Sequence, residues 1–223
     1  IAVPGARVDG RDFIDAAIAQ GASAILASCD EAARHGELEQ RKGTPVIAFA
    51  DLAQRLSALA GRFYGEPAKR LTLIGVTGTN GKTSVASFVR QIWTHAGVPG
   101  ASIGTLGVET ANRLIEGSHT TPDSRTLHQS MRALKAQGID HVAIEASSHG
   151  LDMYRLDGLQ FTAAAFTNLT RDHLDYHGTM EVYRASKLRL FEELLVSGGT
   201  AVINTAAPEY DHIANIAAER KQR

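Results

Sequence analysis

The chain has 223 residues, of which 43% are hydrophobic and 21% are charged, as is ordinary for a globular protein with a sizeable core. Its formal net charge of −1 argues against nucleic-acid or membrane binding through bulk charge, so any phosphate binding needs a local site. The single cysteine, Cys29, excludes an internal disulfide and favours a reducing, cytoplasmic location. No apolar run approaches the roughly 18 residues of a membrane span.

The first part of the chain alternates helix and strand signals. Apolar residues at helical spacing predict a helix over 9–20, which Gly21 ends. Two short apolar runs and a segment that Asp51 can cap predict two strands and a helix, at 24–27, 45–49 and 51–63. Turn-forming residues at 64–67 then predict a boundary between a small N-terminal α/β domain, 1–66, and a second domain, 67–223.

Strands and helices continue to alternate from Leu71 onward. Apolar runs predict strands at 71–76, 101–105, 141–145, 161–168 and 200–204. Helices are expected at 82–96, 122–137 and 180–195, and Pro208 is expected to open a last helix. This alternation predicts an α/β fold whose second domain is a mostly parallel sheet with helices on both faces.

A glycine-rich loop lies between a predicted strand and a predicted helix, with the sequence Gly78-Thr79-Asn80-Gly81-Lys82-Thr83. Glycines let backbone N–H groups approach a phosphate, and the following helix N-terminus favours negative charge. Lys82 supplies a charge for the outer phosphates, and the Thr83 hydroxyl is placed to bind Mg²⁺. The general phosphate-loop pattern is Gly, any four residues and then Gly-Lys-Ser/Thr, and Gly75 lies one residue too early to match it. A simple glycine-rich turn is therefore the alternative interpretation.

Polar residues follow two other predicted strands. Glu145 ends one strand, where a carboxylate can hold Mg²⁺ beside the loop or can simply face solvent. The segment 168–178 contains two His and two Asp, including His173, and reads as either a site or a polar connection. Lys187 alone reads as a solvated helix lysine. Ser147-Ser148-His149-Gly150 lacks the Gly-x-Ser-x-Gly pattern of a serine hydrolase.

Together these motifs identify a family. The phosphate loop resembles that of the Mur ligases and folylpolyglutamate synthetases. Other parts of the chain resemble the Mur ligases that add the third amino acid of the peptidoglycan stem peptide. These parts are segments 145–151, 166–178 and 183–187, Thr120-Thr121 and the N-terminal segment 4–13. The resemblance covers nearly the whole chain.

The resemblance implies roles for individual residues. It implies catalytic roles for Lys82, Lys187 and His173, with Lys187 carbamylated. ATP contacts would come from Gly78, Thr79, Asn80, Gly81, Lys82, Thr83 and Ser84. Two Mg²⁺ ions would be held by Thr83, Glu145, His173 and Lys187. The UDP-sugar peptide would be held by Thr120, Thr121, Ser147 and Arg155. Arg7 would also contact it, although the resemblance at this position is weaker.

The activity that the resemblance implies is ATP-dependent ligation of an amino acid to UDP-N-acetylmuramoyl-L-alanyl-D-glutamate through an acyl phosphate, by a cytoplasmic monomer, in peptidoglycan synthesis. Meso-diaminopimelate is favoured over L-lysine as the acceptor. Another Mur ligase, a folylpolyglutamate synthetase and a non-catalytic nucleotide-binding homologue are the alternatives.

The chain departs from the family pattern in several places. Met153 stands where a related enzyme has Gln, and Ser186 replaces the usual Ala before Lys187. The C-terminal acceptor-binding domain, the last part of the ATPase domain and the extreme N-terminal segment of the family have no counterpart in these 223 residues. We therefore expect the chain to be a fragment at both ends, and inactive in ligation.

Overall fold

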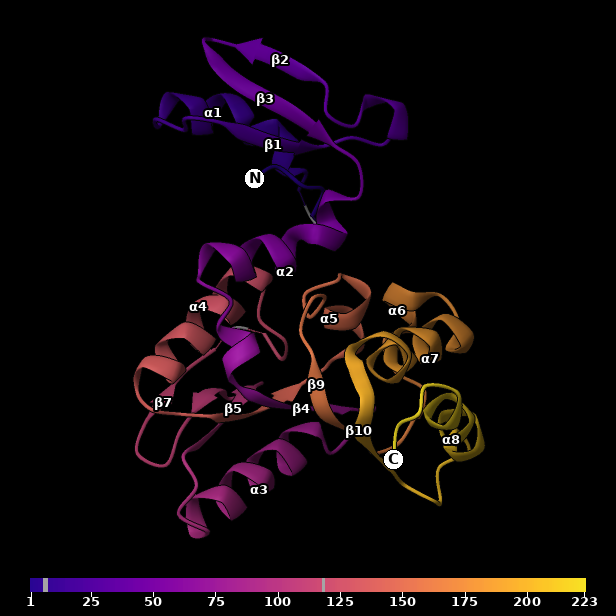
Figure 1. Cartoon of the computed structure of the whole chain (residues 1–223). Helices are drawn as coiled ribbons and strands as arrows, with labels where there is room; N and C mark the ends of the chain where they lie inside the picture. Colours follow the sequence, from indigo (N-terminus) through magenta and orange to yellow (C-terminus); the bar gives the residue numbers. More distant parts are fainter. Residues whose placement is uncertain (6–7, 118) are drawn as a thin grey trace. The chain divides into compact units, whose positions relative to one another are not determined.

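Figure 1 shows a computed structural model of the chain, which describes residues 1–5, 8–117 and 119–223. Contacts between Cα atoms divide it into two compact units, Ile1–Leu56 and Ser57–Arg223. The division falls within helix α2 (Leu52–Phe63), which follows the last strand of the first unit. Each unit is built around its own sheet.

The first unit contains a three-stranded sheet in the order β1-β3-β2. Strand β3 is parallel to β1 and antiparallel to β2. Ala2, Ile14, Ile25 and Val46 form its core. The predicted helix and both predicted strands are present, and the elements are η1 (Gly10–Phe13), α1 (Ile14–Ala19), β1 (Ile25–Ser28), η2 (Ala32–Arg34), β2 (Leu38–Arg41) and β3 (Thr44–Phe49).

The second unit is built on a seven-stranded sheet in the order β10-β9-β4-β8-β5-β6-β7. The five strands from β10 to β5 are parallel, whereas β6 and β7 pair antiparallel. The mostly parallel sheet that the sequence predicts is therefore confirmed. Its strands are β4 (Thr72–Thr77), β5 (Gly100–Gly104), β6 (Gly107–Glu109), β7 (Leu114–Ile115), β8 (His141–Glu145), β9 (Phe161–Phe166) and β10 (Leu195–Ile203).

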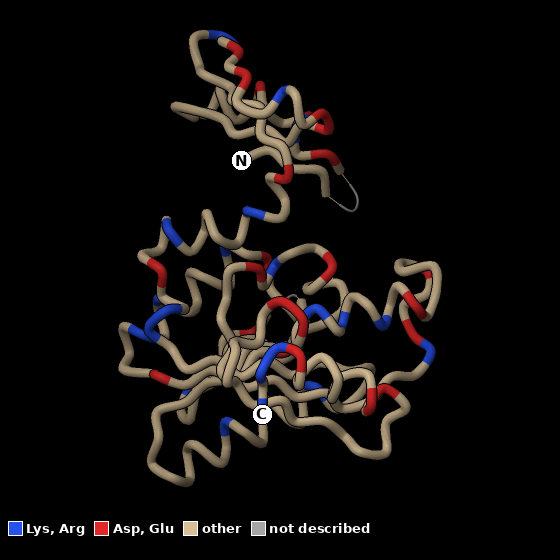
Figure 2. The backbone as a smooth tube through the Cα atoms, turned by 45° about the vertical axis from the view of Figure 1, so that its right-hand side comes forward, with Lys and Arg blue, Asp and Glu red and all other residues tan. Residues whose placement is uncertain are grey.

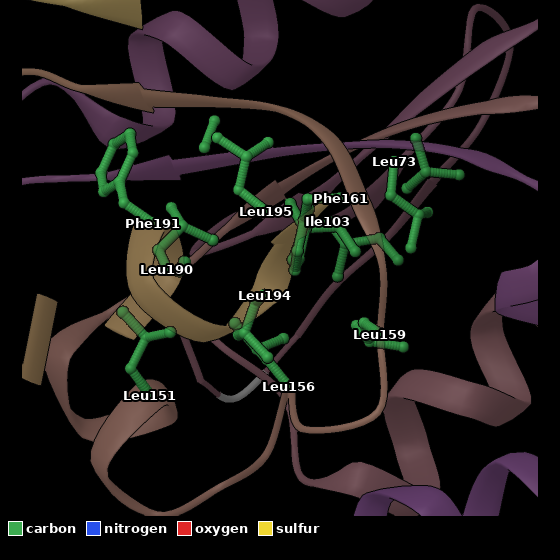
Figure 3. Packing of buried hydrophobic residues seen from close by; sticks show 14 of the residues in the cluster. Leu73, Ile103, Leu151, Leu156, Leu159, Phe161, Leu190, Phe191, Leu194 and Leu195 are labelled. Atoms are coloured by element: carbon green, nitrogen blue, oxygen red, sulfur yellow. The ribbon is translucent and has the colours of Figure 1, made fainter. Parts of the chain in front are cut away.

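Helices cover both faces of this sheet, as Figure 1 shows for α3 and α4. Helix α3 packs Ala86 against Val76 and Ala143. The opposite face carries the larger core, in which Leu73, Ile103 and Phe161 meet apolar residues of α4 and of the segment after α7 (Figure 3). The helices are η3 (Pro67–Arg70), α3 (Lys82–His95), α4 (Ser124–Ala136), α5 (Ser148–Asp152), α6 (Leu174–His177), α7 (Met180–Arg189) and α8 (Tyr210–Glu219).

The helix predicted over 180–195 is present, but it changes from α-helical to π-helical geometry after Arg189. Residues Leu190–Leu194 form a π-helical turn, and β10 begins at Leu195 rather than at 200. The turn buries Leu190, Phe191 and Leu194. Leu190 packs onto Gly75 of β4, where an added Cβ would lie 2.8 Å from its Cδ1. Burial of these side chains against the sheet decides the local geometry over the helical pattern.

Figure 2 shows Lys and Arg interspersed with Asp and Glu along the backbone, in agreement with the net charge of −1. Within the three described stretches of the chain, we find no helix with the length and apolar character of a membrane span.

Candidate active site

The glycine-rich loop lies at the carboxyl end of β4, the middle strand of the parallel part of the sheet. It connects Thr77 to the first residue of α3, Lys82. Gly78 has φ +139°, and a Cβ there would lie 2.0 Å from the Thr167 hydroxyl oxygen. Gly81 has φ +86°. Both positions therefore require glycine, for backbone conformation and, at Gly78, for space.

The segment after β9 holds the loop from the side. The Thr79 amide donates to the Asn168 carbonyl at 2.8 Å. The Asn80 amide donates to Asn168 Oδ1 at 3.0 Å, while Asn168 Nδ2 donates to the Asn80 carbonyl at 3.2 Å. The Asn168 carboxamide thus pairs with the backbone of Asn80 through both of its polar atoms. Thr167 Oγ1 adds a bond to the same carbonyl at 2.6 Å.

Two lysines share one carbonyl of the loop. Lys82 Nζ donates to the Gly78 and Thr79 carbonyls at 3.0 and 2.8 Å. Lys187 Nζ, on α7, donates to the Gly78 carbonyl at 2.7 Å. Lys187 is only 1% exposed. Burial, and then the nearby positive charge of Lys82, lower the pKa of Lys187 to about 7. Burial beside Lys82 therefore favours the uncharged Lys187 amine more than in an ordinary lysine.

Glu145 lies at the carboxyl end of β8, next to β4, with 2% of its surface exposed. Its Oε2 accepts from the Thr83 hydroxyl at 3.0 Å. Its Oε1 accepts from the Thr105 amide at 2.9 Å. A carboxylate beside a hydroxyl at a phosphate loop fits a hard cation such as Mg²⁺. Among the described residues, no group of three or more His, Cys, Asp and Glu side chains is arranged to hold a metal ion.

Glu145 occupies space that Gly104 leaves open. A Cβ on Gly104 would lie 1.9 Å from Glu145 Oε1. We expect Gly104→Ala to displace this carboxylate and to weaken Mg²⁺-dependent nucleotide binding about tenfold or more, because the carboxylate would lose its bond to the Thr105 amide. Titration with ADP in the presence and absence of Mg²⁺ measures this effect. Gly138→Ala is the control for backbone strain alone, because its φ of +79° disfavours a side chain while no atom lies within 4 Å of a Cβ there. Equal ADP affinity in the Gly104 variant and the parent would contradict the expectation.

The residues implied in substrate binding gather around Thr121. Thr121 Oγ1 donates to the Glu145 carbonyl at 2.7 Å and lies 2.9 Å from Ser147 Oγ. Arg155 Nη1 donates to the Thr121 carbonyl at 2.7 Å, and its Nη2 contacts Met153 Sδ at 3.2 Å. The Thr120 hydroxyl accepts from Thr105 at 3.0 Å. The residue that replaces the family's Gln, Met153, thus lies directly against Arg155.

His173 belongs to a group of imidazole and phenol rings. It has φ +51°, its Nε2 lies 3.6 Å from Asp172 Oδ2, and its ring centre lies 4.8 Å from that of His149. The His149 ring also lies 4.3 Å from the Tyr176 ring. Burial, and then the charge of His173, lower the pKa of His149. These contacts place His173 on the side of the site formed by α5 and α6.

The structure therefore brings most of the predicted site residues to the carboxyl ends of β4, β8 and β9. Ser84 lies exposed in the first turn of α3. Arg7 lies outside the described residues. The sequence indicated no role for Thr105, Asn168 or Tyr183, although Asn168 lies in the family-like segment 166–178 and Tyr183 in the segment 183–187.

Comparison with known families decides the assignment. Residues 76–223 match the model described as Mur ligase middle domain, and residues 1–64 match the model described as Mur ligase family, catalytic domain. The chain belongs to the Mur ligase family. The matched middle domain contains the phosphate loop together with Glu145, His173 and Lys187.

Two curated relatives are named UDP-N-acetylmuramoyl-L-alanyl-D-glutamate–2,6-diaminopimelate ligase. The Mur ligase from Rhizobium meliloti is 50% identical over 203 residues, covering 91% of this chain and 40% of the relative. The one from Pseudomonas aeruginosa is 51% identical over 191 residues, covering 86% of this chain and 38% of the relative. The chain thus spans about 40% of the length of the relatives it matches.

Solved structures agree with the fold. A structure of a ligase with the same name superposes with a TM-score of 0.78 at 31% identity, covering 96% of this chain and 42% of that one. MurF from Acinetobacter baumannii superposes at 0.60 with 17% identity, covering 99% of this chain and 43% of that one. A folylpolyglutamate synthase from Mycobacterium tuberculosis complexed with ADP superposes at 0.63 with 16% identity, covering 77% and 46%. The last two show a shared fold alone.

Proposed function

We propose that this Mur ligase chain is part of an ATP-dependent ligase that joins meso-diaminopimelate to UDP-N-acetylmuramoyl-L-alanyl-D-glutamate in peptidoglycan synthesis. The observation that carries the proposal is about 50% identity, over 91% of the chain, to a ligase named for this reaction. The site supports it, because a phosphate loop, two lysines and a buried carboxylate lie together at one edge of the sheet. A cytoplasmic monomer remains the expectation.

The proposed reaction has two steps. The D-glutamate γ-carboxylate attacks the γ-phosphorus of ATP, which forms an acyl phosphate and releases ADP. The amine of diaminopimelate then attacks the acyl carbon, and phosphate leaves as the amide forms and a proton is lost. The chain would position the substrates and offset the charge on the transferring phosphoryl group, and it would form no covalent intermediate with them. On nucleotide binding, Lys82 Nζ would exchange its two carbonyl partners in the loop for phosphate oxygens.

The surroundings of Lys187 favour its carbamylation. Its buried amine lies beside Lys82, and both ammonium groups donate to the Gly78 carbonyl. Addition of CO₂ to the uncharged amine, with loss of a proton, would replace a second positive charge by a negative one and would relieve the repulsion from Lys82. A pKa of about 7 makes the uncharged amine available for this reaction near neutral pH.

The residues present also fit Mg²⁺. Thr83 and Glu145 offer a hydroxyl and a carboxylate 3.0 Å apart, and a carbamate on Lys187 would add a further oxygen. With His173, these residues would hold two ions, which would offset negative charge on the transferring phosphoryl group. Thr121, Ser147 and Arg155 would bind the UDP-sugar peptide beside Glu145, with Thr120 at the edge.

A substrate screen tests the proposed function. A ligase of full family length that carries this sequence should form amide from UDP-muramoyl dipeptide, ATP and meso-diaminopimelate, measured by mass spectrometry. L-lysine, and a folate substrate with glutamate, serve as comparison pairs. Preference for the folate pair would favour a folylpolyglutamate synthetase, and preference for L-lysine would correct the acceptor. Release of no ADP with any pair would favour a non-catalytic homologue.

The 223-residue chain by itself is expected to form no amide and to bind nucleotide weakly. The proposed acceptor site has no counterpart in it, since the chain spans about 40% of the length of relatives named for the complete reaction. Incubation of the purified chain with all three substrates, followed by mass spectrometry, measures the product. Amide formation above the enzyme-free background would refute this expectation.

A further inference from the structure

Tyr183 connects α7 to the phosphate loop. It lies one helical turn before Lys187, and its side chain is fully buried at 0% exposure. Its hydroxyl oxygen lies 3.0 Å from the Thr79 hydroxyl oxygen, which is also buried. A phenol buried this completely needs a hydrogen-bond partner, and Thr79 supplies it.

The hydrogen bonds of Thr79 fix the direction of this contact. Thr79 Oγ1 donates its only proton to the Thr170 carbonyl at 3.2 Å and accepts from the Thr170 amide at 3.0 Å. Its one remaining capacity is a second acceptor position. The Tyr183 hydroxyl therefore donates to Thr79. With the Tyr183 bond in place, the Thr79 hydroxyl makes all three of its possible hydrogen bonds.

The ring of Tyr183 also contacts the reactive lysine. Lys187 Nζ lies 4.5 Å from the ring centre, so the ring packs beside the lysine nitrogen whether or not that nitrogen is charged. The same Nζ donates to the carbonyl of Gly78, the residue before Thr79. The Tyr183 side chain thus contacts both Thr79 of the phosphate loop and the Lys187 amine, which bonds to the neighbouring residue Gly78.

We propose that Tyr183 is a positioning residue of the nucleotide site, whose hydroxyl holds the Thr79 corner of the phosphate loop and whose ring directs Lys187 toward the loop. The proposal rests on the proposed nucleotide-binding function. When Lys82 leaves the Gly78 and Thr79 carbonyls for phosphate, the loop loses two internal bonds. The bond from Tyr183 to the Thr79 side chain does not depend on Lys82, so it keeps this corner in place.

The first test needs no nucleotide. Tyr183→Phe keeps the ring and removes the hydroxyl. Amide hydrogen exchange in the 223-residue chain should speed up about five- to tenfold at Thr79 and Asn80, as expected for loss of one hydrogen bond. Exchange in the core of β4 and the unfolding temperature separate this local effect from a general loss of stability. Tyr154→Phe removes a phenol hydroxyl from a ring that stacks on Arg189 and should leave both amides unchanged.

The second test measures nucleotide. In the ligase of full family length, Tyr183→Phe should raise the Kd for Mg·ADP and the KM for ATP about five- to tenfold, with the KM for UDP-muramoyl dipeptide unchanged. The variant Thr79→Val, alone and combined with Tyr183→Phe, completes a double-mutant cycle on the Kd for Mg·ADP. If Tyr183 acts through Thr79, the combined variant should bind no more weakly than Thr79→Val alone.

The outcomes separate this inference from the proposed function. Unchanged exchange at Thr79 and Asn80, or additive effects in the cycle, would overturn the role of Tyr183. A parent protein that binds no Mg·ADP would instead refute the nucleotide-binding function, and the exchange result would still decide whether Tyr183 holds the loop.

Discussion

Replacement of Lys82 by alanine is expected to abolish ATP-dependent acyl-phosphate formation in the full ligase. In the proposed function the Lys82 ammonium would supply the loop's charge for the outer phosphates, and in the structure it reaches the Gly78 and Thr79 carbonyls from the first turn of α3. Loss of a single preorganised hydrogen-bond donor from an oxyanion hole costs about a hundred- to a thousandfold in rate, and Lys82 would contribute a full charge as well. ADP release in the presence of UDP-muramoyl dipeptide measures the step without the acceptor amine.

Lys69→Ala serves as the matched control. Lys69 is an exposed lysine of η3 that pairs with Glu66 on the surface, so its loss should leave ADP release within about twofold of the parent. Unchanged thermal unfolding would show that the Lys82 variant is folded. ADP release by Lys82→Ala at the parent rate would remove Lys82 from the mechanism.

Replacement of Lys187 by alanine is the second large effect. We expect activity to fall about a hundredfold or more, and to be partly restored by added short carboxylates such as acetate. The reason is geometric, because the alanine variant leaves space beside the Gly78 carbonyl where a small anion can take the place of the carbamate. Initial rates across an acetate series, with chloride at equal ionic strength, measure the restoration.

Two comparisons make the Lys187 test specific. Lys82→Ala should not be restored by acetate, because it lacks a cation rather than an anion. Depletion of CO₂ should lower the activity of the parent but not that of acetate-restored Lys187→Ala. Full activity of the Lys187 variant without any carboxylate would rule out the carbamate role.

The sequence was sufficient to predict the parts of the fold that depend on local pattern. The parallel strands of the second unit are apolar runs between helices, and the structure contains each of them within a few residues of the expected limits, apart from the start of β10. Strand β2 was missed because Leu38-Glu39-Gln40-Arg41 is mostly polar and exposed. Strands β6 and β7 have three and two residues, too few to show alternation.

The residues of the candidate site also divide into those that local sequence pattern predicts and those that it does not. The rule that the carboxyl ends of parallel strands meet at one edge left Glu145 either beside the loop or exposed, and the structure places it, buried, against Thr83. The supports of the loop could not be predicted in this way. Tyr183 reaches Thr79 from 104 residues further along the chain, and Asn168 reaches Asn80 from 88 residues further along. Such contacts depend on how α7 and the end of β9 pack, which no local pattern specifies.

The packing of Leu190 on Gly75 has a consequence for how this site can change. Leu190 follows Lys187 by three residues, so its packing on β4 lies directly beside the end of α7 that carries the lysine. A methyl group on Gly75 would lie 2.8 Å from Leu190 Cδ1 and 3.1 Å from Phe161 Cδ1, so it would disturb the packing of the segment that follows Lys187. Gene variants at this inconspicuous strand glycine should therefore behave as active-site lesions, and compensating changes should arise at Leu190.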